Sequence, residues 1–241
     1  MTSLFDTLQS MPYPGRTIIV GAGPGGQRGV LYAITGRSPS SQARRLVIDE
    51  QEQKIFVRPT DEDTLKTGNP DLLVYAAIMC AKGGIAVSNG KQTGDVFKAL
   101  QAESRVSRVL QDGLSDWEYE PDEPNWTPRI SGCIAENAAL SVLKRSENGD
   151  VLRNTFEIPL IAGQGRMVST YTGVNVNPLP SFAGEPVALE LPFANAREAA
   201  EGLYEALAPV AGENDFRVAA AAAFAGPDGT VNLYVNNRHA E

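Results

Sequence analysis

The sequence predicts an α+β protein built largely from antiparallel sheets, each covered by a layer of helix. Predicted strands outnumber helices, and they follow one another as sequential hairpins, which is typical of antiparallel sheets. Only two segments have clear amphipathic helical spacing, and they lie about 100 residues apart. The 241 residues suit a core that needs no metal or disulfide. We expect residues 1–13 to form an N-terminal extension with a short helix, and residues 14–241 to form a single domain.

The first hairpin is predicted where the chain imitates a dinucleotide-binding loop. Residues 17–26, TIIVGAGPGG, place Gly21, Gly23 and Gly26 in a G-x-G-x-x-G pattern. A Rossmann fold requires a helix directly after that loop, so that the helix N-terminus faces the pyrophosphate. Here Gly29 and the run VLYAIT favour a strand instead, and a Ser-Pro-Ser-Ser sequence then interrupts the chain. The sequence therefore predicts a hairpin and not a Rossmann fold.

The remaining elements follow from alternating apolar residues, turn signals and helical spacing. One long helix is predicted over residues 93–114, with Val96, Leu100, Val106 and Leu110 on one face and Gly113 as its stop. A second helix is predicted over 195–210. Strands are predicted within 44–50, 53–60, 68–90, 130–136, 139–146 and 155–173, and a last hairpin within 218–239. Residues 115–129 form a loop rich in acidic, aromatic and proline residues.

Charge and composition exclude several classes of protein. The formal net charge of −8 would repel a phosphate backbone, so we expect no nucleic-acid partner. There is no apolar run of about 18 residues and no basic, apolar leader, so we expect no membrane span and a cytoplasmic protein. Cys80 and Cys133 fit buried free thiols, although an amidohydrolase that works through one of them remains an alternative. No paired histidines suggest a metal site, and we predict an enzyme without a cofactor.

Several short motifs occur in an order that resembles one known family. They are Pro-Gly-Arg ahead of the first strand (14–16), Y-x-x-x-x-R-S (32–38), N-P-x-x-x-x-Y (69–75), V-S-N-G-x-x-T (87–93), Y-E-x-D-E-x-N-x-T-P-R-I (119–130) and S-T-Y (169–171). An alanine-rich strand follows them. Each motif is weak alone, but the ordered set resembles the archaeal-type IMP cyclohydrolases from about residue 14 to about residue 233. The chain departs from that pattern in its N-terminal segment, in the longer loop RSPSSQARR and in the Pro-rich segment 176–187.

This resemblance implies a fold, a reaction and a ligand. The family has the four-layer αββα architecture of the N-terminal-nucleophile hydrolases, used without autoproteolysis, and it tends to form homo-oligomers. Its members close the ring of 5-formamidoimidazole-4-carboxamide ribonucleotide to give IMP in purine biosynthesis, so the implied partner is a small ribonucleotide. A relative that binds purine ribonucleotides without catalysis remains the alternative, because the arginine loop is altered.

The resemblance also implies which residues catalyse the reaction. The essential acid of the family falls on Glu120, with Asp122 and Glu123 as nearby competitors. A carboxyl group in such a loop can act as a general base if its pKa is raised. The essential arginine falls on Arg37 or Arg44, and the altered loop length leaves open which of the two is catalytic. A guanidinium suits either role, an oxyanion or a phosphate contact, because it stays charged and donates in a fork.

Residues around these motifs are candidates for substrate binding. They are Asn69, Tyr75, Ser88, Asn89, Thr93, Tyr119 and Arg129, and Tyr171 is a further pocket candidate. Simpler interpretations stand beside these roles. Asn69 and Asn89 suit turns, because each precedes a turn-forming residue. Tyr75 suits the core, and Arg129 suits an ion pair with a nearby acid.

Overall fold

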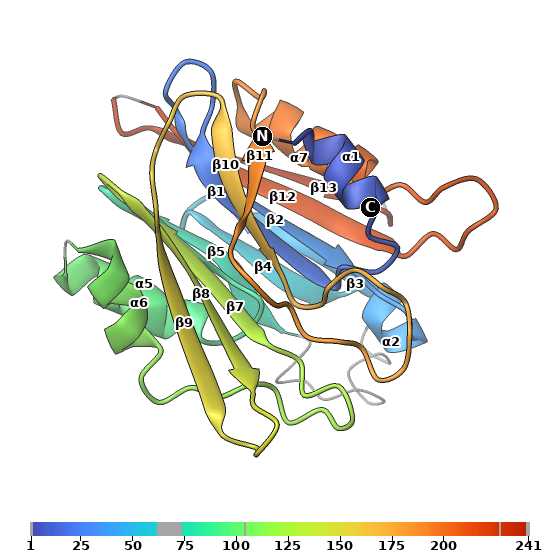
Figure 1. Ribbon diagram of the computed structural model, residues 1–241. Helices are drawn as coiled ribbons and strands as arrows, with labels where there is room; N and C mark the ends of the chain where they lie inside the picture. Colours follow the sequence, from blue (N-terminus) through green and yellow to red (C-terminus); the bar gives the residue numbers. More distant parts are fainter. Residues whose placement is uncertain (1, 62–73, 104, 227, 240–241) are drawn as a thin grey trace.

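The computed structural model describes residues 2–61, 74–103, 105–226 and 228–239. Within these residues the strands form two antiparallel sheets. The six-stranded sheet has the order β11-β10-β1-β2-β12-β13, and the seven-stranded sheet runs β3 to β9 in sequence order. The two sheets lie against each other (Figure 1). The prediction of an α+β protein with mainly antiparallel sheets is confirmed.

The first sheet is built around the hairpin that the glycine loop was predicted to form. Strand β1 (Arg16–Ala22) pairs with β2 (Arg28–Thr35), with Ile19 opposite Leu31. No helix follows Gly26, which turns the chain with a positive φ of 81°. The other strands of this sheet are β10 (Gln164–Ser169), β11 (Val187–Glu190), β12 (Arg217–Ala225) and β13 (Val231–Asn237).

The second sheet is a meander in which neighbours in sequence are neighbours in space. Its strands are β3 (Arg44–Asp49), β4 (Lys54–Pro59), β5 (Tyr75–Ala81), β6 (Gly84–Ser88), β7 (Arg129–Ile134), β8 (Ala138–Arg145) and β9 (Val151–Ile158). Each pairs antiparallel with the next, and β6 and β7 do so although residues 89–128 and two helices separate them in the sequence.

Helices cover the outer face of each sheet, and apolar side chains fill the space between the sheets. Helices α1 (Leu4–Gln9) and α7 (Ala196–Ala206) pack on the first sheet (Figure 1). The alanine run of strand β12 (Arg217–Ala225) is explained by burial, because both faces of this strand are packed against other elements. Ala220 and Ala222 face the helices, whereas Ala219 and Ala221 face the other sheet. Leu4 and Leu8 of α1 are buried in the same cluster, so the N-terminal segment is part of the packed structure.

The long helix predicted over 93–114 is wrong in one respect, because the structure has two helices there. They are α5 (Thr93–Ala102) and α6 (Val106–Gly113), and they cover the second sheet. The helical hydrogen bonding ends where Glu103 adopts an extended backbone, and the Glu103 carboxylate accepts a hydrogen bond from the Arg105 backbone N–H at 2.9 Å. Gly113 does end α6, but it also allows close packing: a Cβ there would lie 2.9 Å from Val96 Cα in α5.

Two short elements escape the sequence prediction, and one of them shapes the site. Helix α2 (Pro39–Gln42) forms where the Ser-Pro-Ser-Ser sequence suggested only a break, because Ser38 caps it by accepting a hydrogen bond from Ser41 N. Strand β11 occupies the end of the Pro-rich segment. Helix α2 and the loop before β7 lie at the lower end of the molecule in Figure 1. Among the described residues, no helix combines the length and apolar character needed to cross a membrane.

Candidate functional site

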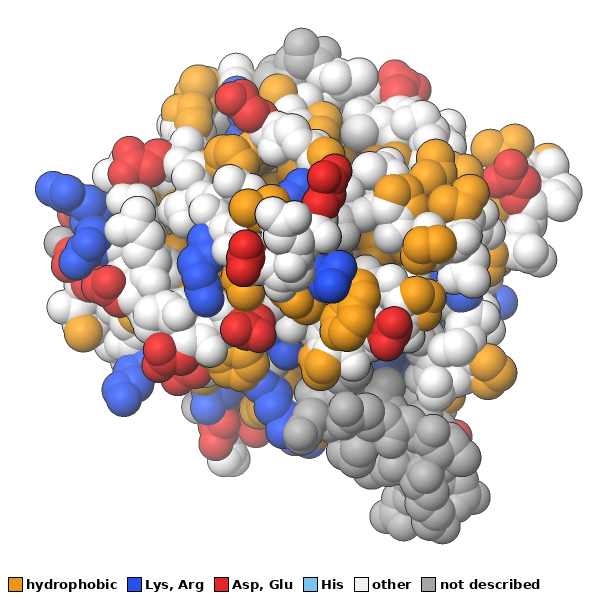
Figure 2. All heavy atoms as spheres, turned by 60° about the horizontal axis from the view of Figure 1, so that its bottom comes forward, with side chains coloured by type: hydrophobic (Ala, Val, Ile, Leu, Met, Phe, Trp, Pro, Cys, Tyr) orange, Lys and Arg blue, Asp and Glu red, His pale blue; other side chains and the backbone are white. Residues whose placement is uncertain are grey.

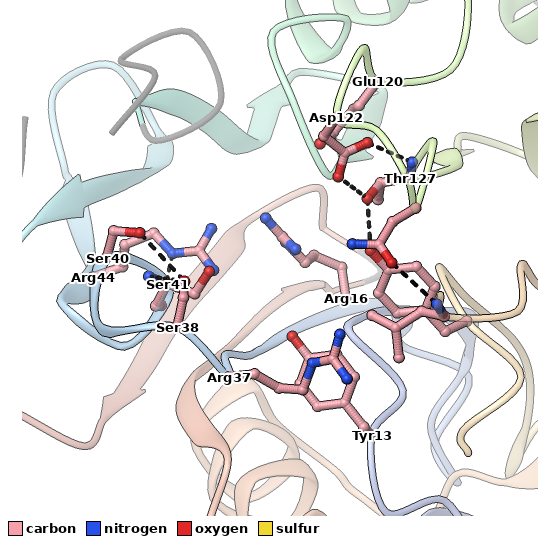
Figure 3. Close-up of a pocket in the computed structure, with 13 residues that line it drawn as sticks. Tyr13, Arg16, Arg37, Ser38, Ser40, Ser41, Arg44, Glu120, Asp122 and Thr127 are labelled. Carbon is pink, nitrogen blue, oxygen red and sulfur yellow. Dashed lines mark hydrogen bonds between the residues drawn. The ribbon is translucent and has the colours of Figure 1, made fainter. Parts of the chain in front are cut away.

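Three segments that are distant in the sequence enclose a cavity of about 260 Å³. One is the head of β1, one is the α2 region leading into β3, and one is the loop before β7; residues after β10 complete the wall. The lining is rich in groups that carry charge or hydrogen bonds (Figure 3). Its members are Tyr13, Arg16, Arg37, Ser38, Ser40, Ser41, Arg44, Glu120, Asp122, Asn125, Thr127, Tyr171 and Leu179.

Glu120 supplies a buried carboxyl group to this cavity. Its backbone N–H donates to Thr127 O at 2.9 Å, which fixes the loop, and only 3% of the residue is exposed. Its Oε1 lies 3.8 Å from Arg129 Nη1 and accepts a long 3.5 Å hydrogen bond from Asn89 Nδ2. Burial raises the pKa of Glu120 above its ordinary value, although the positive charges of Arg16 and Arg129 oppose that shift. A carboxylate with a raised pKa is a stronger base, and so is better suited to take a proton from a substrate.

Arg44 supplies a guanidinium that is buried and incompletely paired. It is the first residue of β3 and is fully inaccessible to solvent. Its Nε donates to Ser41 O at 2.9 Å, but its two terminal nitrogens have no hydrogen-bond partner in the described part of the chain. Burial and the nearby charge of Arg16 lower the pKa of Arg44 to about 10, so the group remains charged at neutral pH. A buried cation with unused donors favours an anionic ligand.

Arg16 places a second guanidinium in the same cavity, and sequence reasoning did not single it out. It is the first residue of β1, and its Nε is also without a partner among the described residues. In Figure 3 it lies between Arg44 and the segment that carries Asp122 and Thr127. Arg16 belongs to the Pro-Gly-Arg motif ahead of the first strand, but that motif alone gave it no role.

Gly15 sets the position of Arg16. Its φ is +77°, and a Cβ at this residue would lie 2.1 Å from Thr170 Oγ1 and 2.6 Å from the Tyr171 ring. The Arg16 N–H then donates to Thr170 Oγ1 at 3.1 Å, and Thr170 N donates back to Arg16 O at 2.9 Å. The glycine therefore allows the head of β1 to approach the end of β10 closely.

Arg37 also borders the cavity, but its guanidinium is engaged elsewhere. It donates to Asn175 Oδ1 and Val176 O, both at 3.0 Å, and it lies over the Tyr13 ring at 5.0 Å from the centroid. Of the two arginines that the sequence left open, Arg44 is the one whose terminal nitrogens are buried without a partner among the described residues.

A chain of hydrogen bonds crosses the wall opposite Arg44 (Figure 3). Asp122 Oδ1 accepts from Thr127 N at 2.6 Å, and Asp122 Oδ2 accepts from Thr127 Oγ1. Thr127 Oγ1 is in turn 2.6 Å from the Tyr171 hydroxyl. Burial raises the pKa of Tyr171 to about 12, so this phenol keeps its proton at neutral pH.

Two predicted binding residues lie behind Glu120 and not on the cavity wall. Asn89 Oδ1 accepts from Ile130 N and Gln92 Nε2, each at 2.9 Å, and its Nδ2 donates to Pro128 O at 2.9 Å. Arg129 Nη1 donates to Gln92 Oε1 at 3.1 Å, and the guanidinium lies over the Trp117 ring. These contacts hold the loop that carries Glu120.

The other predicted binding residues are engaged away from the lining. The Tyr75 hydroxyl is 2.8 Å from that of Tyr32 in the core between the sheets. Ser88, Thr93 and Tyr119 hydrogen-bond to Ser131 Oγ, Gly90 O and Gly149 O respectively, each at 2.8 Å. Asn69 falls outside the described residues. Direct contact of any of these residues with a ligand stays a prediction.

Neither cysteine has the setting of a reactive thiol. Both are free and buried, and burial raises the pKa of Cys80 and of Cys133 to about 12. A nucleophilic thiol requires a lowered pKa, which disfavours the thiol-dependent amidohydrolase. Among the described residues, no three His, Cys, Asp or Glu side chains are grouped as a metal site would require.

A family model described as IMP cyclohydrolase-like protein matches residues 13–229, a span that includes every residue lining the cavity. No curated protein matches the chain.

Proposed function

The chain belongs to the IMP cyclohydrolase-like family, and from that premise we propose that it catalyses the dehydrative closure of 5-formamidoimidazole-4-carboxamide ribonucleotide to IMP. The observation that carries this proposal is the cavity in which a buried carboxyl group with a raised pKa faces two incompletely paired guanidinium groups. The proposed ligand is a small ribonucleotide, and the proposed role is in purine biosynthesis.

The proposed fold is the four-layer αββα arrangement of the N-terminal-nucleophile hydrolases. Three apolar clusters support it: one lies between the sheets and one lies under the helices on each outer face. In this arrangement the cavity draws on both sheets, because Arg16 belongs to one and Arg44 to the other.

The proposed chemistry needs a base for one nitrogen. The carboxamide nitrogen forms a bond to the formyl carbon while Glu120 takes one of its protons. The formyl oxygen then leaves as water, which takes up this proton and the proton of the formamide nitrogen. The bond between the formamide nitrogen and the former formyl carbon becomes C=N. Both reacting groups belong to one molecule, so the protein mainly has to orient them and move protons.

Two cations divide the remaining roles. Among the charges around Glu120, that of Arg16 acts on it most strongly, which supports Arg16 as the donor to the oxygen that becomes negative during attack. Arg44 lines the cavity beside Ser38, Ser40 and Ser41, which supports a contact with the phosphate. The opposite division would make the catalytic arginine Arg44, one of the two candidates that the sequence leaves open.

The test is ring closure by the purified chain, followed by ultraviolet absorbance. We expect turnover by the wild type, and a loss of about 10²–10⁴-fold in kcat for Glu120→Gln, with IMP binding largely retained. Glu123→Gln is the matched control, because Glu123 is exposed in the same loop and does not line the cavity. Full activity of Glu120→Gln would remove this residue from the mechanism. Wild-type binding of IMP without turnover would support the non-catalytic relative instead.

A further inference from the structure

The Asp122–Thr127–Tyr171 chain has a direction that follows from counting hydrogens. Asp122 Oδ2 accepts the single hydroxyl hydrogen of Thr127. Thr127 Oγ1 can then only accept from Tyr171, which lies 2.6 Å away. The phenol hydrogen of Tyr171 is therefore used inside the wall, and its oxygen has only lone pairs left for the cavity.

The Tyr171 oxygen is held firmly in this role. The residue is only 3% exposed, and its ring stacks on Tyr13 at a centroid distance of 5.9 Å. Its backbone N–H donates to Pro14 O at 3.2 Å, and Gly15 leaves no room for a side chain beside the ring. A fixed phenol oxygen that cannot donate would repel a carbonyl or phosphate oxygen and attract an N–H or O–H group.

We propose that Tyr171 is a hydrogen-bond acceptor that selects a donor group of the bound ribonucleotide, with Asp122 and Thr127 as the positioning residues that set its polarity. This inference rests on the proposed function for the identity of the ligand. Arg16 and Arg44 donate hydrogen bonds to the acceptor oxygens of the ligand. Tyr171 accepts a hydrogen bond from an N–H or O–H group of the ligand. In IMP, such donors are N1–H, which derives from the amide nitrogen of the ribotide, and the ribose hydroxyls.

Figure 2 shows acidic, basic and hydrophobic side chains intermixed over the described residues of the face that it presents. The hydrogen-bond chain instead has a defined chemistry and a wall of the cavity to act on.

The experiment is a mutant cycle that measures the Kd of IMP by calorimetry. Tyr171→Phe removes the acceptor, and we expect about tenfold weaker binding. Asp122→Asn keeps the shape, but its amide N–H₂ can donate to Thr127 Oγ1, which turns the Thr127 hydrogen towards Tyr171 and the phenol hydrogen into the cavity. We expect a similar loss for Asp122→Asn, and no further loss in the double variant, because both changes remove the same acceptor.

Glu123→Gln is the matched control, because Glu123 is exposed in the same loop and does not line the cavity, and it should bind IMP as the wild type does. Thr127→Ser keeps the hydroxyl and should bind IMP more tightly than Thr127→Val does. Thr127→Val breaks the chain and should weaken binding. Circular dichroism detects any variant that unfolds. Thr127→Ser and Asp122→Asn keep the buried hydrogen-bonding groups, so these two variants decide the test if another one unfolds.

Three analogues distinguish the donors. If the amide nitrogen is the donor, Tyr171→Phe should leave the Kd of 1-methyl-IMP unchanged. The same substitution should still weaken the binding of 2′-deoxy-IMP and 3′-deoxy-IMP. If a ribose hydroxyl is the donor, one deoxy analogue should lose it instead. Wild-type affinity in Tyr171→Phe, or additive losses in the double variant, would overturn the acceptor role while leaving the proposed function intact. A wild type that neither binds IMP nor closes the ring would overturn both.

Discussion

Arg44 shows how a single side chain can be placed for a ligand at the expense of stability. Its guanidinium is fully buried, yet two of its three nitrogens have no partner among the described residues. Taking a cation out of water costs several kcal/mol unless hydrogen bonds and an opposite charge offset it. The second cation nearby, Arg16, adds repulsion. An anionic ligand would relieve both effects, so ligand binding and folding stability should be linked at this residue.

Arg44→Met tests that link. Methionine fills a similar volume without charge, so we expect the free energy of unfolding to rise by about 1–4 kcal/mol in urea titrations without ligand. The pKa of Arg44 is about 10, so the cost of its buried charge applies at neutral pH and is relieved only as the pH rises through about 10. The increase in the free energy of unfolding should therefore be constant across the neutral pH range.

The same variant should lose the increase in Tm that IMP gives the wild type. Arg37→Met is the control, because the Arg37 guanidinium is hydrogen-bonded to the 175–176 segment and the residue is partly exposed. If Arg44→Met is less stable than the wild type without ligand, the guanidinium has a stabilising partner and the linkage is absent.

The candidate site could be predicted from the sequence only in part. Glu120 and the pair Arg37 and Arg44 were predicted by motif resemblance, which names positions without stating their surroundings. Arg16 was missed because nothing within its own segment requires it: its place in the site depends on Thr170, 154 residues away, and on the close approach that Gly15 allows. Most of the binding residues predicted near strand ends are hydrogen-bonded in the loop or the core, and local sequence does not tell a cavity wall from its support.

At the scale of elements, the hairpins could be predicted and the helix break could not. A hairpin depends on turn residues and alternation within about 20 residues, so the β1–β2 and β12–β13 hairpins were foreseen. Helices α5 and α6 share one helical periodicity across residues 93–114, which hides the extended backbone at Glu103. Helices α5 and α6 pack against each other where Gly113 approaches Val96, and the sequence of neither helix alone predicts that contact.

Gly113→Ala tests the contact between α5 and α6. Alanine favours a helix by about 1 kcal/mol over glycine. Here, however, the new Cβ would lie 2.9 Å from Val96 Cα and 3.0 Å from Asp95 O, which are backbone atoms that cannot rotate away. We expect the clash to dominate and the free energy of unfolding to fall by about 1–3 kcal/mol.

Gly94→Ala is the matched control for that prediction. Gly94 lies in α5, is exposed, and a Cβ there would meet nothing within 4 Å. It should be neutral or stabilising by up to about 1 kcal/mol in the same urea titration. Equal stabilisation by both changes would show that α5 and α6 do not pack as closely as the structure has them.

For the whole molecule, the relation between the two sheets determines the cavity. Arg16 begins a strand of the first sheet, whereas Arg44 begins β3, the edge strand of the second. A side chain of the edge strand β13 hydrogen-bonds to the backbone of the edge strand β3. Asn237 Oδ1 accepts from Leu46 N at 2.8 Å, and Asn237 Nδ2 donates to Leu46 O at 2.9 Å. This pair imitates backbone pairing between strands, and it holds β3 two residues from Arg44.

Asn237→Ala should therefore affect both stability and the site. The change leaves the Leu46 N–H and C=O without their partner, so we expect a loss of about 1–3 kcal/mol in the free energy of unfolding. We also expect weaker IMP binding, because β3 carries Arg44 into the cavity. Asn232→Ala on the exposed part of β13 is the control and should change neither quantity. If Asn237→Ala lowers stability while the Kd of IMP stays at the wild-type value, the edge contact joins the sheets without setting the position of Arg44.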